Sequence, residues 1–224
     1  MLTLHHLNNS RSQRILWLLE ELELDYHIEC YTRDPNTQLA PESLKKIHPL
    51  GKSPVLTDGD KVIAESGAII EYLAQNYGQD WIPTPDSEAY RQYKYWLHYA
   101  EGSLMPYFVM KLVFDKIKSS PLPFLIKPLV QPIINTIYGE VMKSFLGPNI
   151  ASNLQFIEAH LSRSAWFAGA NISGADIQMS FPLEAGLKDS RRTYPHIPAF
   201  LERVHARPAY QRALEAGGTY DYAS

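Results

Sequence analysis

The sequence predicts two domains, an α/β domain followed by an all-helical domain. Strand and helix patterns alternate in the order β-α-β-α-β-β-α up to residue 77. Residues 78–86 then contain one glycine and two prolines, a composition typical of a linker. The rest of the 224 residues shows helical spacing without a convincing strand pattern. We therefore expect one domain at residues 1–80 and a second at residues 87–224.

The elements of the first domain follow from the spacing of its apolar residues. Alternating apolar residues predict strands, and apolar residues three or four positions apart predict helices. A tight turn at residues 58–60 joins the last two strands into an antiparallel hairpin. In chain order, we expect a strand at 2–5, a helix at 10–22, a strand at 26–31, a short helix at 41–47, strands at 55–57 and 62–64, and a helix at 65–77.

Two capping patterns indicate where helices begin. Ser10 with Gln13 matches a capping box, in which two side chains bond to free backbone N–H groups of the first turn. Ser173 with Asp176 matches the same pattern, and a cap of this kind stabilises a helix by about 0.5–2 kcal/mol. Asp176 is therefore expected to be structural and not a catalytic carboxylate.

The second domain is expected to consist of long helices. Pro106 should kink the first of them, because proline removes a backbone hydrogen bond inside a helix. The most apolar stretch, residues 122–137, is interrupted by three prolines. We interpret it as a buried or dimer-facing helix, with contact to a membrane surface as the alternative. The predicted helices cover residues 87–118, a proline-interrupted stretch to 146, and then 150–163, 174–187 and 197–206.

Composition excludes several classes of protein. Hydrophobic residues make up 45% and charged residues 20%, as in ordinary globular proteins, and a net charge of -3 does not favour nucleic acid. Cys30 is the one cysteine, so an internal disulfide is impossible and a reducing, cytoplasmic location is expected. The N-terminus lacks the pattern of a signal peptide. No apolar run approaches the roughly 18 residues of a transmembrane segment.

Ser10 is the first candidate for chemistry. The start of a helix presents free N–H groups and a partial positive charge, which favour an anion such as a thiolate. A serine hydroxyl at that place can donate a hydrogen bond to the same anion. Ser12 competes for this role, and a purely structural helix cap is the other interpretation of Ser10.

Two further segments favour a ligand that resembles an amino acid or a short peptide. Lys52 supplies a cation, and Pro54 at the head of a strand marks a bend or a cis bond, which would turn the backbone of Ser53 outward to pair with an extended ligand. Glu65 offers an acceptor for an ammonium group, and Ser66 with the next helix start offers a site for a carboxylate. A plain turn and a plain helix cap are the competing interpretations.

Other motifs are weaker or missing. Most aromatic residues between 90 and 108 are expected to pack in the core or an interface, and a few to line an apolar pocket. The absence of Cys-x-x-Cys argues against a dithiol oxidoreductase. His5 and His6 have no third ligand at metal spacing, so no metal site is expected. The sequence contains neither a glycine-rich phosphate loop nor a Gly-x-Ser-x-Gly elbow.

Taken together, these segments resemble the glutathione S-transferase family along nearly the whole chain. The first matches the serine-type active-site segment of theta-like and phi-like enzymes, with Ser10 followed by Arg14 inside the first helix. Residues 51–56 match the family's cis-proline segment, residues 64–69 its glutamate-serine segment and residues 172–177 its helix-capping segment. In the second domain, residues 99–104 and 172–177 are also similar to the microbial and fungal branch of the family. The matching segments are residues 10–14, 51–56, 64–69, 99–104 and 172–177.

The resemblance implies a thioredoxin-like N-terminal domain that binds glutathione and a helical domain that holds a small hydrophobic electrophile. It implies that Ser10, with Ser12 as runner-up, stabilises the glutathione thiolate. Glutathione would contact Lys52, Ser53, Pro54, Glu65 and Ser66, and the electrophile Tyr107, Phe108 and Lys111.

The implied function is conjugation of glutathione to hydrophobic electrophiles, as in detoxification. A glutathione-dependent peroxidase acting on organic hydroperoxides is an alternative, as is a non-catalytic glutathione-binding protein. The family also implies a homodimer, glutathione as a co-substrate and no permanently bound cofactor. Cys30 lies in an expected strand and away from the helix start, which disfavours the cysteine-type classes.

Overall fold

A four-stranded sheet forms the centre of the N-terminal domain in the computed structural model, which describes residues 1–186 and 194–223. The strand order is β2-β1-β3-β4. Strand β1 pairs in parallel with β2, whereas β3 pairs antiparallel with both β1 and β4. The strands are β1 (Leu2–Leu7), β2 (Tyr26–Tyr31), β3 (Val55–Asp58) and β4 (Lys61–Ala64).

The helices of this domain complete the predicted order β-α-β-α-β-β-α and confirm the thioredoxin-like fold. The second helical segment is a short 3-10 helix, not an α-helix, because Pro41 precedes it and the segment continues for only five residues. The helical elements of the domain are α1 (Ser12–Glu21), η1 (Glu42–Lys46) and α2 (Ser66–Tyr77), and the short turn η2 (Gln79–Trp81) follows them.

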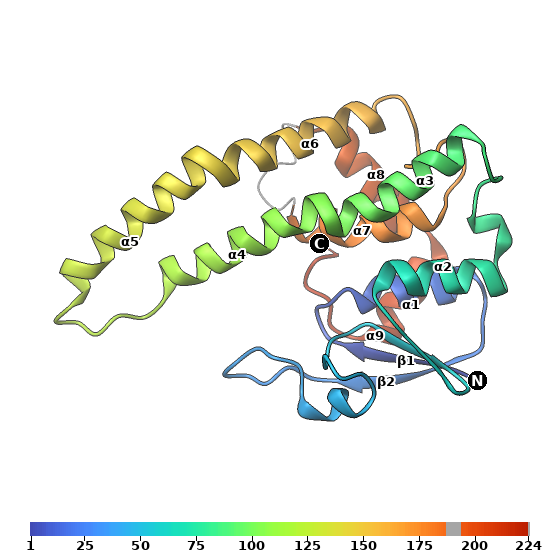
Figure 1. Ribbon diagram of the computed structural model, residues 1–224, viewed down its shortest axis with the longest axis horizontal. Coiled ribbons are helices and arrows are strands. Elements are labelled where there is room, and N and C mark those ends of the chain that lie inside the picture. Colours follow the sequence, from blue (N-terminus) through green and yellow to red (C-terminus); the bar gives the residue numbers. More distant parts are fainter. Residues whose placement is uncertain (187–193, 224) are drawn as a thin grey trace.

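Helix α1 is buried on nearly all sides. Its apolar spacing predicted one inward face, yet Leu16 and Trp17, outside that face, are also buried. The reason is that α1 packs against β1 on one side and against α7 and α9 on the other. Figure 1 shows α1 and α2 in the lower right of the molecule, beneath α3 and α7 of the second domain, with α9 on the other side of α1. Residues at the start of α1 therefore lie where the two domains meet.

The predicted capping box at the start of α1 is wrong. The helix begins at Ser12, and the side chain of Gln13 does not turn back to the N-terminus. Instead, Gln13 Nε2 donates a hydrogen bond of 2.9 Å to the carbonyl of Ala213, because α9 packs directly against this turn. Ser10 Oγ accepts a hydrogen bond of 3.2 Å from the backbone N–H of Ser12.

The described part of the second domain is helical, apart from an isolated bridge between Trp166 and Gly169. The last helix, α9, was not predicted, although a proline at its start is a common helix signal. The predicted end of α7 at Leu187 lies outside the described residues. The elements are α3 (Glu88–Tyr99), η3 (Ala100–Leu104), α4 (Met105–Ser119), α5 (Lys127–Val141), η4 (Met142–Leu146), α6 (Gly147–Leu161), α7 (Gly174–Gly186), α8 (His196–His205) and α9 (Pro208–Gly217).

Prolines affect these helices in different ways. Pro106 stands in the first turn of α4, directly after the π-helical turn η3 that separates α3 from α4. The predicted irregularity of this long helix is therefore present, one turn before the proline. Pro132 lies inside α5 without ending it, so the predicted interruption at this proline is wrong.

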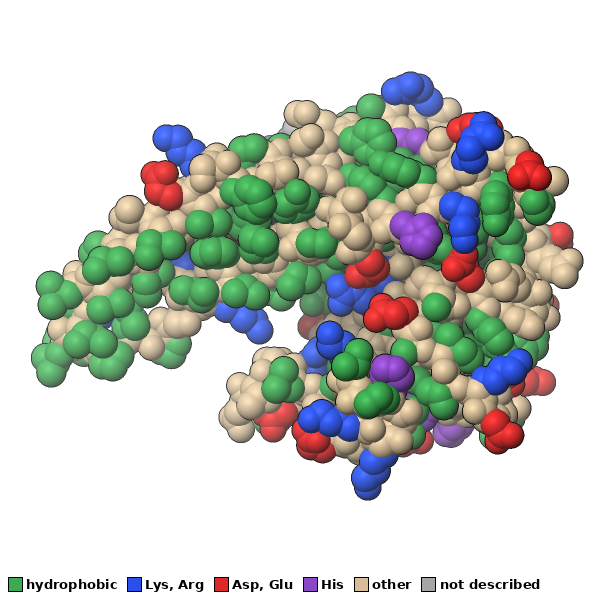
Figure 2. All heavy atoms as spheres, viewed as in Figure 1, with side chains coloured by type: hydrophobic (Ala, Val, Ile, Leu, Met, Phe, Trp, Pro, Cys, Tyr) green, Lys and Arg blue, Asp and Glu red, His purple; other side chains and the backbone are tan. Residues whose placement is uncertain are grey.

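Helices α4 and α5 form a long hairpin that extends away from the rest of the molecule (Figure 1). Phe124 and Leu125 at its tip are 88% and 84% exposed, and apolar side chains cover its visible face in Figure 2. The interpretation of residues 122–137 as a buried helix is thus wrong within this chain, and a dimer-facing helix stays a prediction. None of the described helices combines the length and apolar composition needed to cross a membrane.

The capping box at the start of α7 is confirmed. Asp176 Oδ2 accepts hydrogen bonds from the backbone N–H and the hydroxyl of Ser173, and Ser173 Oγ accepts one from the N–H of Ala175. The other carboxylate oxygen accepts from the N–H of Phe167 at 2.8 Å. Asp176 is fully buried and joins the preceding loop to α7. Its role is structural, as its position in the sequence predicts.

Candidate functional site

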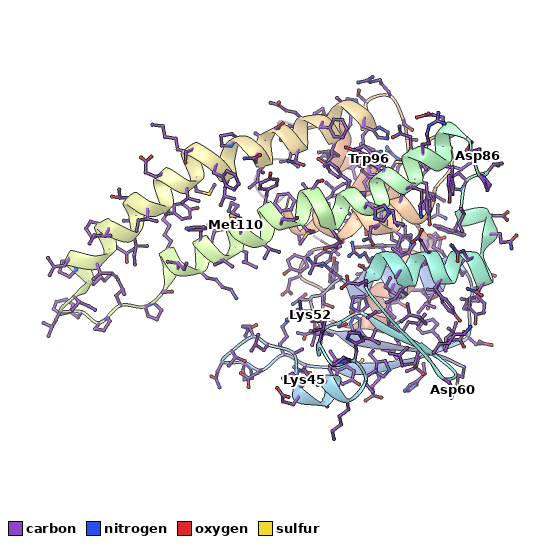
Figure 3. The ribbon with its side chains drawn as sticks, viewed as in Figure 1. Lys45, Lys52, Asp60, Asp86, Trp96 and Met110 are labelled. Atoms are coloured by element: carbon purple, nitrogen blue, oxygen red, sulfur yellow. The ribbon has the colours of Figure 1, made fainter. Side chains whose placement is uncertain are left out.

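A polar cleft of about 220 Å³ lies between the N-terminal domain and η3, the turn that precedes α4. It brings together all five residues that the sequence assigned to glutathione, which come from two separate segments of the chain. Figure 3 shows Lys52 on the side of the N-terminal domain that faces the helical domain. The residues lining the cleft are Arg11, His48, Leu50, Lys52, Ser53, Pro54, Ala64, Glu65, Ser66 and Glu101.

The segment before β3 is fixed to the end of β1 by Ser53. Ser53 Oγ donates a hydrogen bond of 2.9 Å to the carbonyl of His5 and accepts one of 3.2 Å from the N–H of Leu7. The Ser53–Pro54 peptide bond is cis. The hydroxyl of Ser53 is therefore used within the fold, while Lys52 remains exposed beside the cleft.

Glu65 and Ser66 occupy the N-terminal end of α2. Glu65 has φ 70°, a conformation that costs a residue with a side chain of this size about 1–3 kcal/mol. Its carbonyl accepts the hydrogen bond from Ile69 that opens the helix. The strained backbone places the Glu65 carboxylate at the cleft beside the free N–H groups of the first turn. One end of the cleft thus offers both an acceptor for a cation and donors for an anion.

Arg14 supports this end of the cleft from inside the protein, a role that the sequence did not predict. Its side chain is 1% exposed, and its guanidinium donates to the carbonyl of Gln178, to Ser66 Oγ and to Glu101 Oε1, each at 2.5 Å. Arg11 donates to both carboxylate oxygens of Glu101 at 3.0 Å. Arginine suits this position because its planar fork reaches several acceptors at once.

Glu101 pairs with two arginines, Arg11 and Arg14. Burial favours a higher pKa for Glu101, but Arg14 and Arg11 outweigh this effect and hold its pKa below the ordinary value. Burial lowers the pKa of Arg14, and the charge of Glu101 opposes that change. Glu101 stands in η3, at the entrance to α4, so this charge cluster links the two domains at the cleft. Its sequence signal is the Tyr-Ala-Glu-Gly-Ser-Leu segment, which by itself assigned no role to the glutamate.

The two candidate serines lie just behind the cleft and are not among the residues that line it. Ser10 is 6% exposed and Ser12 is fully buried. Their hydroxyl oxygens are 2.8 Å apart, and Ser12 Oγ also contacts the backbone of Leu7 and the ring of His6. Both serines are neighbours of Arg11, which lines the cleft. Ser10 is the more accessible of the two, because Ser12 has no exposed surface.

The residues predicted for the electrophile lie on α4. Tyr107 stacks obliquely with Phe145, with ring centroids 5.9 Å apart. Phe108 packs against Gly186 of α7, where a Cβ atom would lie 2.3 Å from its ring. Lys111 forms an ion pair of 2.7 Å with Asp115. The polar cleft is not lined by any of these three side chains.

The C-terminal segment contacts the loop that carries Ser10, which the sequence did not predict. Asn9 and Asp221 form two hydrogen bonds, one from each residue, at 2.7 and 2.9 Å. Tyr220 donates to the buried carboxylate of Glu184 in α7, which holds the segment in place. Asn9 has φ 50°, a left-handed conformation that asparagine tolerates better than most residues. The asparagine at this position was the only local signal in the sequence for an unusual backbone conformation in the loop that carries Ser10.

The described residues include no group of three or more metal-binding side chains. His5 and His6 are neighbours in β1, and their rings therefore point to opposite faces of the sheet. His5 Nδ1 contacts Tyr31 Oη, whereas His6 contacts Ser12 and the C-terminal end of α9. The pair does not form one site.

A thioredoxin-like domain, a helical domain and a cleft at their junction define the architecture of glutathione-dependent transferases, and comparison with known proteins agrees. The family model for the glutathione S-transferase N-terminal domain matches residues 1–75, and the model for the C-terminal domain matches residues 123–208. The chain belongs to the glutathione S-transferase family.

Similar proteins cover nearly the whole chain. Glutathione S-transferase 3 of Schizosaccharomyces pombe is 37% identical over 96% of this chain and 87% of its own length. Glutathione S-transferase 1 of Saccharomyces cerevisiae is 33% identical over 96% of this chain and 94% of its own length. A solved glutathione S-transferase from Actinobacillus pleuropneumoniae is 36% identical, with a TM-score of 0.78 and coverage of 100% and 96% of the two chains.

Proposed function

We propose that this protein is a glutathione transferase that conjugates the glutathione thiolate to hydrophobic electrophiles. The observation that carries the proposal is the convergence of Lys52, Ser53, Glu65 and Ser66 on one cleft beside the start of α1. These residues present a cation, a backbone edge, a carboxylate and a helix N-terminus, which together suit a charged peptide. Composition, by contrast, favours no large polyanion.

The γ-glutamyl group of glutathione belongs at the start of α2. Its ammonium group pairs with the Glu65 carboxylate, and its carboxylate accepts from Ser66 and the free N–H groups of the first turn. Ser66 Oγ already accepts a hydrogen bond from Arg14, so its own proton is available to the ligand. The glycyl carboxylate pairs with Lys52 at the other end of the cleft.

The sulfur of glutathione belongs at Ser10, where a hydroxyl and the N-terminus of α1 favour the thiolate. A free thiol has a pKa near ~8.5, so little of it is ionised at neutral pH. Each unit by which the site lowers that pKa requires about 1.4 kcal/mol of preferential stabilisation of the anion. A charge-assisted hydrogen bond and a helix N-terminus supply that amount.

The electrophile belongs on the helical side of the cleft, near the first turns of α4. Glu101, which lines the cleft, lies in η3 directly before this helix, and Tyr107, Phe108 and Lys111 follow within the first two turns of α4. Figure 2 shows a hollow between the α4–α5 hairpin and the N-terminal domain. The proposed domain division at residues 1–80 and 87–224 places glutathione mainly on the first domain and the electrophile mainly on the second.

The proposed assembly is a homodimer in the cytoplasm. Exposed apolar side chains continue along α4 and α5, including Leu112, Val113 and Ile133, and a partner subunit would remove them from water. The single cysteine, Cys30, is an exposed free thiol, which suits a reducing compartment. Sedimentation equilibrium tests the dimer, and a monomer at micromolar concentration would contradict it.

Conjugation of an aryl halide tests the proposed reaction, with Ser10→Ala and Ser12→Ala measured side by side. We expect Ser10→Ala to reduce kcat/KM strongly, and Lys52→Ala to raise the KM for glutathione with little change in kcat. Full activity in Ser10→Ala would refute the role of this serine. Turnover of an organic hydroperoxide without conjugation would indicate a peroxidase, and glutathione binding without turnover a carrier.

A further inference from the structure

A buried chain of hydrogen bonds runs from Ser10 to the far side of α1. Ser10 Oγ lies 2.8 Å from Ser12 Oγ, and Ser12 Oγ lies 2.8 Å from His6 Nδ1. At the other edge of the ring, His6 Nε2 lies 3.1 Å from the carbonyl oxygen of Gly217 at the end of α9. Three polar side chains and one carbonyl thus form a continuous line behind the cleft.

The carbonyl of Gly217 sets the direction of this chain. A carbonyl oxygen only accepts, so Nε2 of His6 carries the proton, and in the neutral ring Nδ1 is then an acceptor. Ser12 therefore donates to Nδ1, which is closer than its other acceptor, the Leu7 carbonyl at 3.2 Å. With its own proton used, Ser12 Oγ accepts from Ser10. Before a ligand binds, the proton of Ser10 points inward and an oxygen lone pair remains for the ligand.

We propose that His6 is the terminal acceptor of the proton that leaves the glutathione thiol, which reaches it through Ser10 and Ser12. This inference rests on the proposed function, because it requires the glutathione sulfur at Ser10. His6 does not touch the substrate, so it acts as a positioning and proton-holding residue through the two serines.

The transfer is a proton relay without redox change. The S–H bond of glutathione breaks and Ser10 Oγ takes that proton, while Ser10 passes its own proton to Ser12, and Ser12 passes its own to His6 Nδ1. The products are a thiolate and an imidazolium. The Ser10–Ser12 and Ser12–His6 hydrogen bonds have reversed, while His6 Nε2 still donates to the Gly217 carbonyl, so Ser10 now donates to the thiolate, as the proposed function requires. Addition of the thiolate to an electrophile lets the same chain run back and return the proton.

The surroundings of His6 suit a temporary proton acceptor. Burial lowers its pKa, which keeps the ring neutral before the transfer and favours return of the proton afterwards, and the hydrogen bond to Gly217 partly offsets this effect and so supports the protonated ring. The polar groups that meet the ring are Ser12 from α1 and the Gly217 carbonyl from α9, and no charged side chain of the described residues shifts its pKa. Because the His6 ring is buried, the serine chain is its link to the cleft.

Gly217 is part of this arrangement. A Cβ atom there would lie 3.4 Å from the His6 ring, 2.6 Å from Gln13 Oε1 and 2.8 Å from Leu16 Cδ1. A glycine thus allows α9 to approach close enough for its carbonyl to reach Nε2. The carbonyl stabilises the imidazolium after the transfer, because both ring nitrogens then donate hydrogen bonds.

His5 provides a matched control. It is the neighbouring histidine of β1 and is also largely buried, but its Nδ1 contacts Tyr31 Oη on the opposite face of the sheet. It has no contact with either serine among the hydrogen bonds of the described residues. Substitution of His5 therefore perturbs the same strand without interrupting the relay.

The test is a pH titration of the thiolate absorbance of bound glutathione, measured for wild type, His6→Asn, Ser12→Ala, Ser10→Ala and His5→Asn. We expect His6→Asn and Ser12→Ala each to raise the apparent pKa of the bound thiol by about one unit, which leaves about tenfold less thiolate at lower pH. A double variant that combines His6→Asn with Ser12→Ala should show no larger shift in the thiol pKa than either single variant, because both substitutions break the same chain of hydrogen bonds. His5→Asn should leave the thiol pKa unchanged.

The outcomes separate this proposal from the function on which it rests. An unchanged thiol pKa in Ser12→Ala and His6→Asn, together with a raised one in Ser10→Ala, overturns the relay and leaves the transferase site intact. An unchanged pKa in Ser10→Ala refutes the placement of the sulfur itself. If His6→Asn does not fold, nitrogen NMR of the wild-type protein can measure whether the His6 ring becomes protonated when glutathione binds as a thiolate. A ring that stays neutral when glutathione is bound as thiolate overturns the proposal.

Discussion

Replacing Arg14 with lysine tests whether one buried guanidinium holds the proposed glutathione-binding end of the cleft in place. Arg14 donates to Gln178, Ser66 and Glu101 from a side chain that is 1% exposed. A lysine ammonium is a compact point charge and cannot reach three acceptors arranged for a planar fork. We expect it to keep the contact with Glu101 and to lose the other two.

The magnitude follows from those contacts. A hydrogen bond that involves a charged group contributes about 1.5–3 kcal/mol, so the loss of two costs about 3–6 kcal/mol before relaxation. Because relaxation recovers part of this cost, we expect a loss at the lower end, about 3 kcal/mol. For a chain of this length, about 1 kcal/mol lowers Tm by about 2–4 °C, so Tm should fall by about 6–12 °C.

Two assays check this prediction. Thermal unfolding followed by circular dichroism gives Tm, and the KM for glutathione reports on the position of Ser66. We expect KM to rise, since Ser66 loses the donor that fixes its hydroxyl. Arg11→Lys is the control, because Arg11 is 34% exposed and contacts only Glu101 among these groups, so its ion pair contributes about 1 kcal/mol or less. An Arg14→Lys protein with wild-type Tm and KM would refute the reasoning.

Three further substitutions have defined outcomes. Burial raises the pKa of Asp176 to about 7, so the folded state binds its proton more tightly than the unfolded chain. The free energy of unfolding should therefore fall as pH rises from about 4 to about 7, and urea denaturation of Asp176→Asn should lack this contribution. Gly217→Ala should destabilise by about 1–3 kcal/mol in urea denaturation, because its Cβ would lie within 3 Å of Gln13 and Leu16. Glu65→Gly should relieve the positive φ and raise Tm, yet weaken glutathione binding by calorimetry, and a simultaneous loss of both would contradict the strain argument.

The proposed relay changes how the adjacent histidines of β1 are understood. In the sequence, His5 and His6 suggested at most half of a metal site. Because a strand directs neighbouring side chains to opposite faces, only His6 can meet α1 and α9.

Local patterns in the sequence determined most of the fold. Apolar spacing predicted the order of strands and helices in the N-terminal domain, since each pattern reflects neighbours within one element. The Ser173–Asp176 cap was predictable for the same reason, because its bonds join residues three positions apart. The proposed glutathione segments, residues 51–56 and 64–69, were recognisable because the expected ligand contacts come from consecutive residues.

Contacts between residues far apart in the sequence became visible only in the folded structure. Gln13 matched a capping box locally, but its amide bonds to Ala213 because α9 packs against α1. Arg14 reaches Gln178, 164 residues further along the chain, and His6 reaches Gly217, 211 residues further. A periodic pattern describes one face of one element and does not specify which other element covers that face. Local patterns were thus enough for the order of the elements and for the proposed glutathione segments, whereas packing between distant elements arranges the groups behind the cleft.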